Sequence, residues 1–361
     1  MLRCRAIDGV WPITGQRPGA TGADIARSSP ITSSPADANG HPTLTLGSHR
    51  LGQSTYPLTG RSDHADGLGR PMGTLDIIGD RSHELGRNPM TNSTTWIPDD
   101  VDVSIPSVAR VYDYLLGGAH NFAADRVLGD KLIAMDPSFQ TATRLTRSAL
   151  SRIVRHLVDS GIRQFLDLGS GIPTAANVHE IAQGLDPRCR VLYVDHDPIA
   201  AAHSELMLSG NDNAAALRAD LRDVDLILGS PEATRLLNLD EPVALIFQMV
   251  LHWIPDADDP AGVVRRYRDA VCPGSYLSIC HVGHGMGAAR KSEVDDEIAR
   301  SGTKDKIFAR DHEQVLELFG DFTLVDPGLV TATAWRPDRY WNADDMTGVN
   351  QDWHTGVAIK A

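Results

Sequence analysis

The sequence contains few cysteines, few aromatic residues and no long apolar run. Only four cysteines occur among 361 residues, and none forms a Cys-x-x-Cys pair. Scattered cysteines favour a reducing cytoplasm over a disulfide framework or a zinc site. No apolar run approaches the roughly 18 residues of a membrane span. The first residues, MLRCRAIDGVWPITG, contain no apolar signal core. We therefore expect a cytoplasmic protein without a membrane segment.

Basic residues are also scarce relative to acidic ones. Lys and Arg total 34 against 47 Asp and Glu, which gives a formal net charge of −13. Binding to nucleic acids or anionic membranes needs basic surface that neutralises phosphates. We expect neither kind of partner, and we expect a small-molecule substrate. The sequence does not predict an oligomeric state.

Residues 1–103 differ in composition from the rest of the chain. They are rich in Gly, Pro, Ser and Thr, as in SSPITSSPADANGHPTLTLG, and they show neither helical nor strand periodicity. Such a segment buries too little apolar area to offset its chain entropy, so we expect a disordered or non-native extension. One hypothesis is that the physiological start lies downstream, with Met90 as the candidate. The intact mass of the native protein tests this hypothesis.

Residues 104–161 are expected to form a helical cover. SVARVYDYLLGG carries an apolar stripe at helical spacing and is stopped by Gly117 and Gly118. NFAADRVLGDKLIAM predicts a second helix that ends at Asp136-Pro137. ATRLTRSALSRIVRHLVDSG predicts a third, with Gly161 as its stop.

Residues 162–361 alternate between strand and helix patterns. Strands are expected at 163–168, 190–195, 214–218, 242–250 and 275–281, and helices at 174–184, 198–208, 223–237 and 259–271. A helical stretch is expected around 286–319, and FTLVDPGLV and WHTGVAIKA predict two more strands. Alternation of this kind predicts an α/β, Rossmann-like core, in which a mostly parallel sheet carries helices on both faces.

The segment FLDLGSGIP, residues 165–173, predicts a strand that runs into the turn Gly169-Ser170-Gly171. Ligands bind at the carboxyl ends of parallel strands, and glycines let the backbone approach them. Thr174 stands where a dinucleotide fingerprint needs its third glycine, and no Gly-Lys-Ser/Thr follows, which excludes a P-loop. The alternative interpretation is a tight turn that binds no ligand.

Acidic residues near this turn indicate the chemistry of its ligand. Asp167 precedes the glycines, where its carboxylate would repel a pyrophosphate but suit a cationic group. S-adenosylmethionine combines an ammonium group with an adenosine. Asp195, with the adjacent His196, ends the second strand and could accept hydrogen bonds from ribose hydroxyls of this cofactor or of NAD. Asp220 could accept from the adenine amino group, and helix capping is the alternative role for the acids after both strands.

Several segments together resemble one protein family. They are IPSVARVYDYLLGGAHNFAADR, QFLDLGSGIPTAANVHEIAQ, VLYVDHDPIAAAHSELML, LRADLRDV, VLHWIPDADDPAGVVRRYRDAVCPGSYLSICH and DPGLVTATAWRPD. They resemble the actinobacterial S-adenosyl methyltransferase family, formerly a domain of unknown function, over about 104 to 361. The resemblance implies a class I methyltransferase fold, whose seven-stranded, mostly parallel sheet has one antiparallel strand. It also implies S-adenosylmethionine as cofactor, but it supplies no substrate.

The sequence departs from the family pattern at two places. Ala119-His120 stands where the family usually carries a Lys-Asp type pair before Asn121. Gln248 and Trp253 stand where ordinary apolar residues are expected. Both departures bear on the substrate side, so a relative's substrate does not transfer to this chain.

Candidates for catalysis and for the cover follow from position. His252 comes after the fourth strand, and a neutral imidazole there could take a proton near pH 7; packing against Trp253 is the alternative. The N-terminal block is expected to close over the cofactor and exclude water. Its candidate residues are Tyr112, Asp113, Gly117, Gly118, Asn121 and Asp125. Helix surface or capping is the alternative role for this block.

These observations together predict a methyltransferase that depends on S-adenosylmethionine and acts on oxygen or nitrogen of a small molecule. His281 and His284 form a pair with no third ligand in view, so no metal site is expected. One alternative is a non-catalytic regulatory module that binds S-adenosylmethionine. Another is an NAD-dependent oxidoreductase, against which Asp167 and the missing third glycine count.

Overall fold

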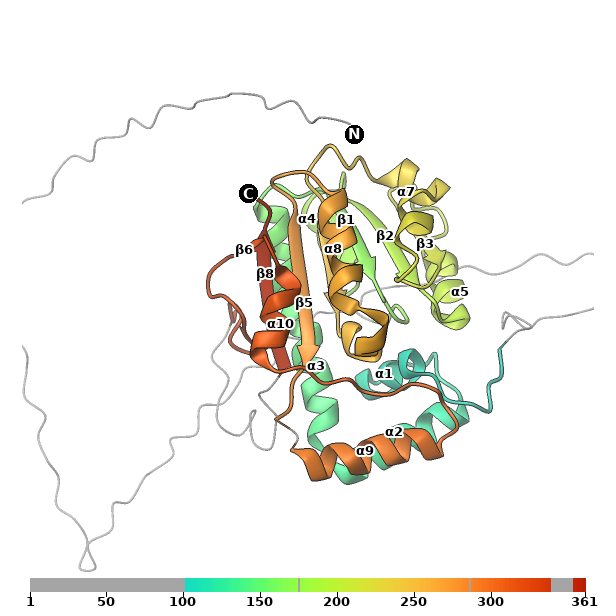
Figure 1. The fold of residues 1–361 in the computed structure, drawn as a ribbon. Coiled ribbons are helices and arrows are strands. Elements are labelled where there is room, and N and C mark those ends of the chain that lie inside the picture. Colours follow the sequence, from blue (N-terminus) through green and yellow to red (C-terminus); the bar gives the residue numbers. More distant parts are fainter. Residues whose placement is uncertain (1–100, 175, 286, 339–352) are drawn as a thin grey trace, which may run out of the picture. The chain divides into compact units, whose positions relative to one another are not determined.

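The computed structural model describes residues 101–338, except 175 and 286, and residues 353–361 (Figure 1). Most of the predicted N-terminal extension, residues 1–103, lies outside the described residues, and so does Met90. The predicted helical cover and most of the predicted core lie within them.

Three helices precede the first strand, as the sequence predicts. They are α1 (Val108–Leu116), α2 (Ala123–Met135) and α3 (Ser138–Asp159). Gly117 ends α1 in the left-handed conformation, with φ of +85°, and α2 ends at Asp136 before Pro137. The stop signals therefore act where the sequence places them, because glycine tolerates the left-handed region and proline cannot continue a helix.

The sheet is mostly parallel, and its strand order reverses beside the first strand. Its strands are β1 (Gln164–Leu168), β2 (Arg190–Asp195), β3 (Ala214–Arg218), β4 (Ala244–Gln248), β5 (Tyr276–Val282), β6 (Thr323–Leu324), β7 (Val330–Thr331) and β8 (Trp353–Ile359). The order is β3-β2-β1-β4-β5-β8-β6, and β7 also pairs with β8. Strands β1 to β5 are parallel, whereas β8 is antiparallel to β5, β6 and β7.

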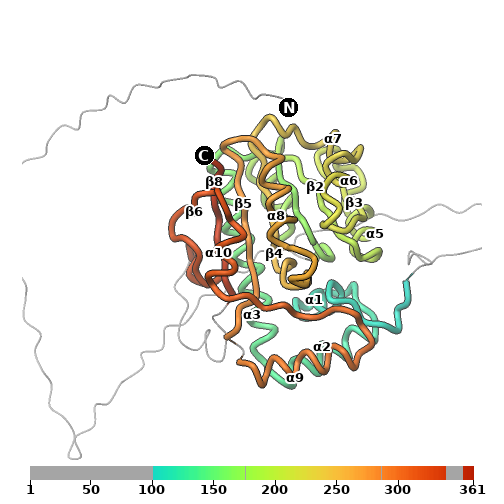
Figure 2. The backbone as a smooth tube through the Cα atoms, in the orientation of Figure 1, coloured from blue at the N-terminus to red at the C-terminus, as the bar shows by residue number. Residues whose placement is uncertain are grey.

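Helices cover both faces of the sheet (Figures 1 and 2). The helices after β1 are α4 (Val178–Leu185), α5 (Pro198–Met207), α6 (Val224–Leu228), α7 (Pro231–Leu236), α8 (Pro260–Ala270), α9 (Ala288–Arg300) and α10 (His312–Phe319), with the short 3₁₀ turns η1 (Leu251–Trp253) and η2 (Asp256–Asp258). Leu166 and Leu168 of β1 pack in one buried cluster with Tyr267 of α8. Phe165 packs in a second buried cluster, with Ile153 of α3. Alternate residues of β1 thus face opposite layers, as expected for a strand buried on both faces.

Two predicted helices differ from those observed. The helix expected at 174–184 begins only at Val178, after Asn177, whose backbone N–H donates to Glu180 Oε2 over 2.9 Å. The helix expected at 223–237 is two helices, because Pro231 has no N–H for a continuous ladder and Ser230 caps α7 through its 3.1 Å bond from Ala233 N.

The C-terminal part differs more. The helical stretch expected at 286–319 is two helices, α9 and α10, joined by a segment without regular secondary structure, residues 303–311, here called the strap. FTLVDPGLV forms β6 and β7 around a turn at Pro327-Gly328, so two short strands share the outer side of β8. Helix α9 packs on the cover, because Val294 and Ile298 join a buried cluster with Leu128 and Leu132 of α2.

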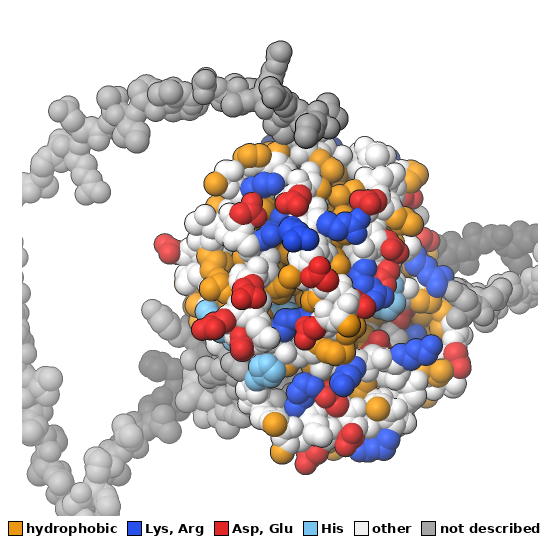
Figure 3. All heavy atoms as spheres, viewed as in Figure 1, with side chains coloured by type: hydrophobic (Ala, Val, Ile, Leu, Met, Phe, Trp, Pro, Cys, Tyr) orange, Lys and Arg blue, Asp and Glu red, His pale blue; other side chains and the backbone are white. Residues whose placement is uncertain are grey.

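Acidic and basic side chains are interspersed over the face in Figure 3. This face shows no continuous basic surface of the kind that nucleic-acid binding requires. Among the described residues, no helix combines the length and apolarity needed to cross a bilayer.

Candidate functional site

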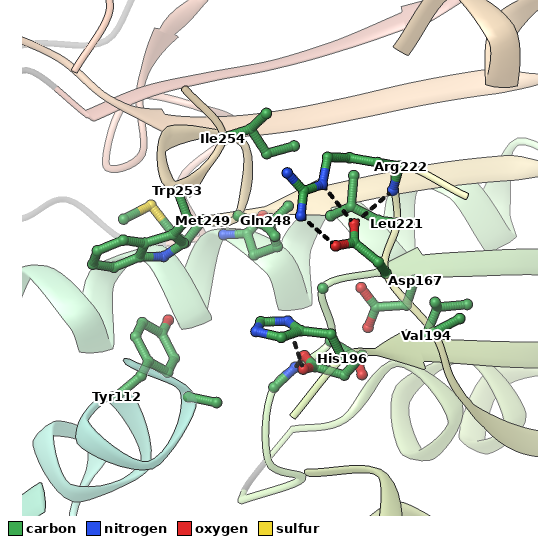
Figure 4. Close-up of a pocket in the computed structure, with 18 of the residues that line it drawn as sticks. Tyr112, Asp167, Val194, His196, Leu221, Arg222, Gln248, Met249, Trp253 and Ile254 are labelled. Carbon is green, nitrogen blue, oxygen red and sulfur yellow. Dashed lines mark hydrogen bonds and ion pairs between the residues drawn. The ribbon is translucent and has the colours of Figure 1, made fainter. Parts of the chain in front are cut away.

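A cavity opens at the carboxyl ends of β1, β2, β3 and β4, where the strand order reverses between β1 and β4 (Figure 4). This is the position at which open parallel sheets bind ligands. Its lining comprises Ala109, Tyr112, Arg147, Leu150, Asp167, Gly169, Ser170, Gly171, Val194, Asp195, His196, Ala219, Asp220, Leu221, Arg222, Gln248, Met249, Val250, Trp253, Ile254 and Asp305. All seven cofactor-binding candidates from the sequence line this cavity.

The glycine turn is held tightly against the neighbouring strands. Gly169 N and Ser170 N both donate to Val194 O of β2, over 2.8 and 3.1 Å. Gly169 has φ of +71°, and a Cβ there would lie 2.1 Å from Val250 Cγ2. Both backbone conformation and space therefore require glycine at this position.

Asp195 connects the turn to β2. Its Oδ2 accepts from Gly171 N over 2.7 Å, and its Oδ1 accepts from Asp197 N over 2.9 Å. A carboxylate has about four lone-pair directions, so further hydrogen bonds remain possible. Burial raises the pKa of Asp195, and the exposed His196 lies 3.7 Å away through Nδ1. The capping role belongs to Asp197, which accepts from the first turn of α5.

Asp167 lies in the cavity wall, on the side of β1 that faces α3. Burial raises its pKa to about 7, with a further increase from Asp195 and an opposing decrease from Arg147 of α3. The proximity of Arg147 could not be predicted from sequence, because it depends on how α3 packs across the sheet. The result is a buried carboxyl group that is easily neutralised unless a cation is nearby.

At the β3 end, Asp220 is paired with Arg222. The guanidinium contacts both carboxylate oxygens of Asp220, and it also contacts Asp258. The side-chain hydrogen bond from Arg222 is the main cause that lowers the pKa of Asp220. Asp220 therefore presents a fixed carboxylate at this end of the cavity, rather than a helix cap.

The opposite end of the cavity is lined by larger, less polar side chains. Tyr112 of α1 lies across the cavity from Trp253 and Met249 (Figure 4). Tyr112 Oη lies 3.2 Å from Thr146 Oγ1, and Gln248 Nε2 donates to Thr146 O over 3.0 Å. Gln248 and Trp253, which form one of the two departures from the family pattern, are thus both part of the cavity wall.

Asp113 connects the cover to the loop that follows the glycine turn. Its carboxylate accepts from His120 N, Asn121 Nδ2 and Thr174 Oγ1 over 2.9, 2.8 and 2.7 Å. A Cβ at Gly118 would lie 2.0 Å from Asp113 Oδ1, so glycine makes room for this carboxylate. None of these residues lines the cavity. They position the cover above the turn.

Asp125 connects the first two helices of the cover and does not line the cavity. It forms a buried ion pair with Arg110, whose Nε lies 2.9 Å from Asp125 Oδ2. It also accepts from Ser107 N and Phe122 N, which holds the starts of α1 and α2 together. In the N-terminal block, Tyr112 is the candidate that reaches the cavity.

His252 does not line the cavity. It is 3% exposed, and its ring lies 4.7 Å from the Trp253 ring and 5.7 Å from the His281 ring. Burial, aided by His281 and Arg310, brings its pKa well below the usual range. The packing role fits this position better than the general-base role.

His281 is a buried acceptor rather than one of a pair of metal ligands. Its Nε2 accepts from Arg310 Nη1 over 2.9 Å, and its Nδ1 contacts Val282 O over 2.8 Å. His284 lines a separate, smaller cavity beside the end of β5. Within the described part of the chain, no cluster of three or more His, Cys, Asp or Glu side chains could hold a metal ion.

Comparison with known proteins identifies the family. The model of the S-adenosyl methyltransferase family matches residues 94–361. The chain belongs to this S-adenosyl methyltransferase family. It is a class I enzyme of the kind that transfers methyl groups from S-adenosylmethionine, and the NAD alternative is rejected. Comparison with curated proteins gave no match.

Two solved structures support the methyltransferase assignment. A proposed methyltransferase from Thermobifida fusca YX is 39% identical to this chain, with a TM-score of 0.68. The match covers 74% of this chain and 99% of that one. A DUF574 family protein from Streptomyces avermitilis MA-4680 is 34% identical, with a TM-score of 0.66, covering 72% and 99%. The predicted fold class is therefore confirmed for this methyltransferase.

Proposed function

We propose that this methyltransferase transfers a methyl group to an oxygen or nitrogen atom of a small molecule. The observation that carries the cofactor part of this proposal is the buried carboxyl group of Asp167, which lies in one cavity with the glycine turn and Asp195. A dinucleotide would bring a pyrophosphate to this turn, whereas S-adenosylmethionine brings a cation. The pKa of Asp167, raised to about 7, would fall when an ammonium group binds beside it.

The described residues fit this cofactor along the length of the cavity. The backbone at Gly169 and Gly171 leaves room for close approach, and Asp195 retains acceptor capacity for ribose hydroxyls. Asp220, which lines the β3 end of the cavity, would accept from the adenine amino group. S-adenosylmethionine supplies the reactive sulfonium methyl group. This chain must therefore bind the cofactor, orient the acceptor molecule toward the methyl group and exclude water from the cavity.

The acceptor molecule would enter at the end of the cavity lined by Tyr112, Gln248 and Trp253. This end lies between the cover and η1, and Asp305 of the strap also lines the cavity. Alignment of a nucleophile with the methyl group can lower a barrier by roughly 7–11 kcal/mol at best. These residues can thus contribute mainly by positioning the acceptor molecule. The buried His252 is not needed as a general base.

Calorimetric titration of the purified chain with S-adenosylmethionine, S-adenosylhomocysteine and NAD tests the binding part of this proposal. We expect binding of the first two and none of NAD; the reverse pattern would refute it. Incubation of a metabolite extract with methyl-labelled cofactor then tests transfer. A labelled small molecule is expected, whereas tight binding without any labelled product would favour a non-catalytic regulatory module.

A further inference from the structure

The strap passes both elements that border one end of the cavity, the cover and η1. Phe308 N donates to His252 O over 2.7 Å, which joins the strap to η1. Ile307 packs against the buried cluster to which α1 of the cover contributes. Figure 1 shows the segment between α9 and α10 running beside α1. The strap therefore lies next to the two elements that carry Tyr112 and Trp253.

Asp305 is the strap residue that lines the cavity. It comes two residues before Ile307 and three before Phe308, and three residues of chain span at most about 11 Å. Its position along the strap is thus fixed by the contacts of the strap with the cover and with η1. The strap places a carboxyl group at the end of the cavity where the acceptor molecule is proposed to enter.

The carboxylate of Asp305 is not neutralised by a basic side chain of the described residues. Its Oδ2 accepts from Thr303 Oγ1 over 2.7 Å, and no described Arg, Lys or His forms an ion pair with it. Lys306 lies instead over the Phe308 ring, 5.7 Å from its centroid. A hydroxyl group does not cancel the negative charge, and a carboxylate has about four lone-pair sites. Asp305 can therefore accept hydrogen bonds from a ligand.

The rest of the lining indicates which kind of ligand suits Asp305. The other acidic residues of the lining, which the proposed function assigns to the cofactor, are Asp167, Asp195 and Asp220. Tyr112 and Trp253 lie across the cavity from each other (Figure 4). The faces of aromatic rings attract cations, and a carboxylate forms its strongest hydrogen bonds with charged donors. A carboxylate together with two aromatic rings suits an ammonium or guanidinium group.

We propose that the acceptor of this methyltransferase is a small molecule with a cationic group, and that Asp305 binds this group beside Tyr112 and Trp253. This inference rests on the proposed function, because it names the substrate class of the same site. It makes Asp305 a specificity-determining residue. The cationic group is not the methylated atom, since a protonated nitrogen has no lone pair with which to attack.

The transfer itself leaves the cationic group unchanged. An uncharged oxygen or nitrogen of the acceptor uses its lone pair to form the new bond to the methyl carbon. The bond between that carbon and sulfur breaks, and its electron pair stays on sulfur, which gives S-adenosylhomocysteine. The proton that the attacking atom carried passes to solvent. Asp305 thus contributes by holding the acceptor in place, which is a contribution of alignment.

A metabolite extract separated by charge tests the substrate class. The extract is passed at neutral pH over a cation exchanger and an anion exchanger. Each fraction is then incubated with the full chain and methyl-labelled S-adenosylmethionine. The labelled product is expected from the fraction that the cation exchanger retains. Label from only the uncharged or anionic fractions would overturn the inference, while the proposed function would stand. Absence of label from every fraction would refute both.

Substitutions at Asp305 test the residue. Asp305→Asn keeps the shape of the side chain but removes its charge, so the apparent KM for the retained fraction should rise about 5- to 30-fold, with a smaller change in kcat. Asp305→Glu restores the charge and should recover most of this loss. Asp296→Asn removes the same charge from an exposed position of α9 outside the cavity lining, and it should keep the wild-type KM.

Calorimetric titration with S-adenosylmethionine separates an acceptor role from a cofactor role. Asp305→Asn should bind the cofactor with the wild-type affinity, within about twofold. A loss of cofactor affinity as large as the rise in KM would assign Asp305 to the cofactor and overturn the inference, and so would an unchanged KM. Thermal melting shows whether each variant folds, and the fractionation with the wild-type chain tests the substrate class even where a variant does not.

Discussion

At the scale of single residues, Asp167 is the residue that we propose determines which kind of ligand the glycine turn accepts. Its position two residues before the turn was visible in the sequence, but its protonation was not. Burial between β1 and α3 raises its pKa to about 7, which only the folded chain can do.

The raised pKa of Asp167 predicts pH-dependent cofactor binding. The carboxylate form increases as pH rises through about 7, and a bound ammonium group favours that form. Affinity for S-adenosylmethionine should therefore increase from pH 5.5 to 7.5, with proton release on binding. Calorimetry in buffers of different ionisation enthalpy measures this release.

The matched variant for this prediction is Asp167→Asn. It should bind about 10- to 100-fold more weakly at pH 7.5 and lose the dependence on pH, since the amide carries no titrating proton. An unchanged pH profile in this variant would assign the proton to another group.

Gly169 is the residue of the glycine turn at which an added side chain should most weaken cofactor binding. In Gly169→Val the new Cβ would meet Val250 at a backbone φ that valine rarely adopts, so cofactor binding should be lost. Gly184→Ala is a suitable control, because Gly184 lies in α4 with no atom within 4 Å of an added Cβ. Titration calorimetry should show normal affinity for the control; normal affinity for Gly169→Val would place the cofactor elsewhere.

At the scale of elements, the strap positions the loop that carries Trp253 and Ile254. Phe308 N donates to His252 O over 2.7 Å, and Arg310 N donates to Val282 O over 3.1 Å. The buried Arg310 guanidinium also donates to Leu251 O, Ile254 O, Asp256 Oδ1 and His281 Nε2. The sequence predicted one helical stretch across this region and missed the strap. A segment that is fixed by hydrogen bonds to distant carbonyl groups has no local sequence pattern of its own.

The network around Arg310 predicts a large loss of stability in Arg310→Met. Several buried acceptors would lose their partner, at a cost of about 2–4 kcal/mol in the free energy of unfolding. Arg266→Ala removes a surface ion pair with Asp225 and should cost less than about 1 kcal/mol. Urea denaturation of both variants measures the difference, and equal midpoints would contradict the role of Arg310.

In the cover, the helix ends follow local sequence signals, whereas the contacts that anchor it join residues far apart in the chain. Helices α1, α2 and α3 end at Gly117, Asp136 and Ser160, close to the predicted stops. The contact of Asp113 with Thr174 and the packing of α9 on α2 join residues far apart in the chain. Such contacts leave no periodic signal, so the sequence could not predict how the cover is anchored.

At the scale of the whole molecule, the family match begins at residue 94, and the cavity is lined by residues from 109 to 305. A chain that starts at Met90 should therefore bind S-adenosylmethionine with the affinity of the full chain, within about twofold. Titration of both chains measures this. Weaker binding by the shorter chain would show that the first 89 residues contribute to the site or to its stability.

The sequence by itself determined the α/β alternation, the glycine turn and the family, because apolar periodicity and short-range turn chemistry are local properties of the chain. It also placed Asp167, Asp195 and Asp220 at strand ends, and all three line one cavity. Only the tertiary structure decided that His252 is buried and that Arg147 lines the same cavity as these three residues. Both outcomes depend on how elements distant in the chain pack together, which sets burial and charge proximity.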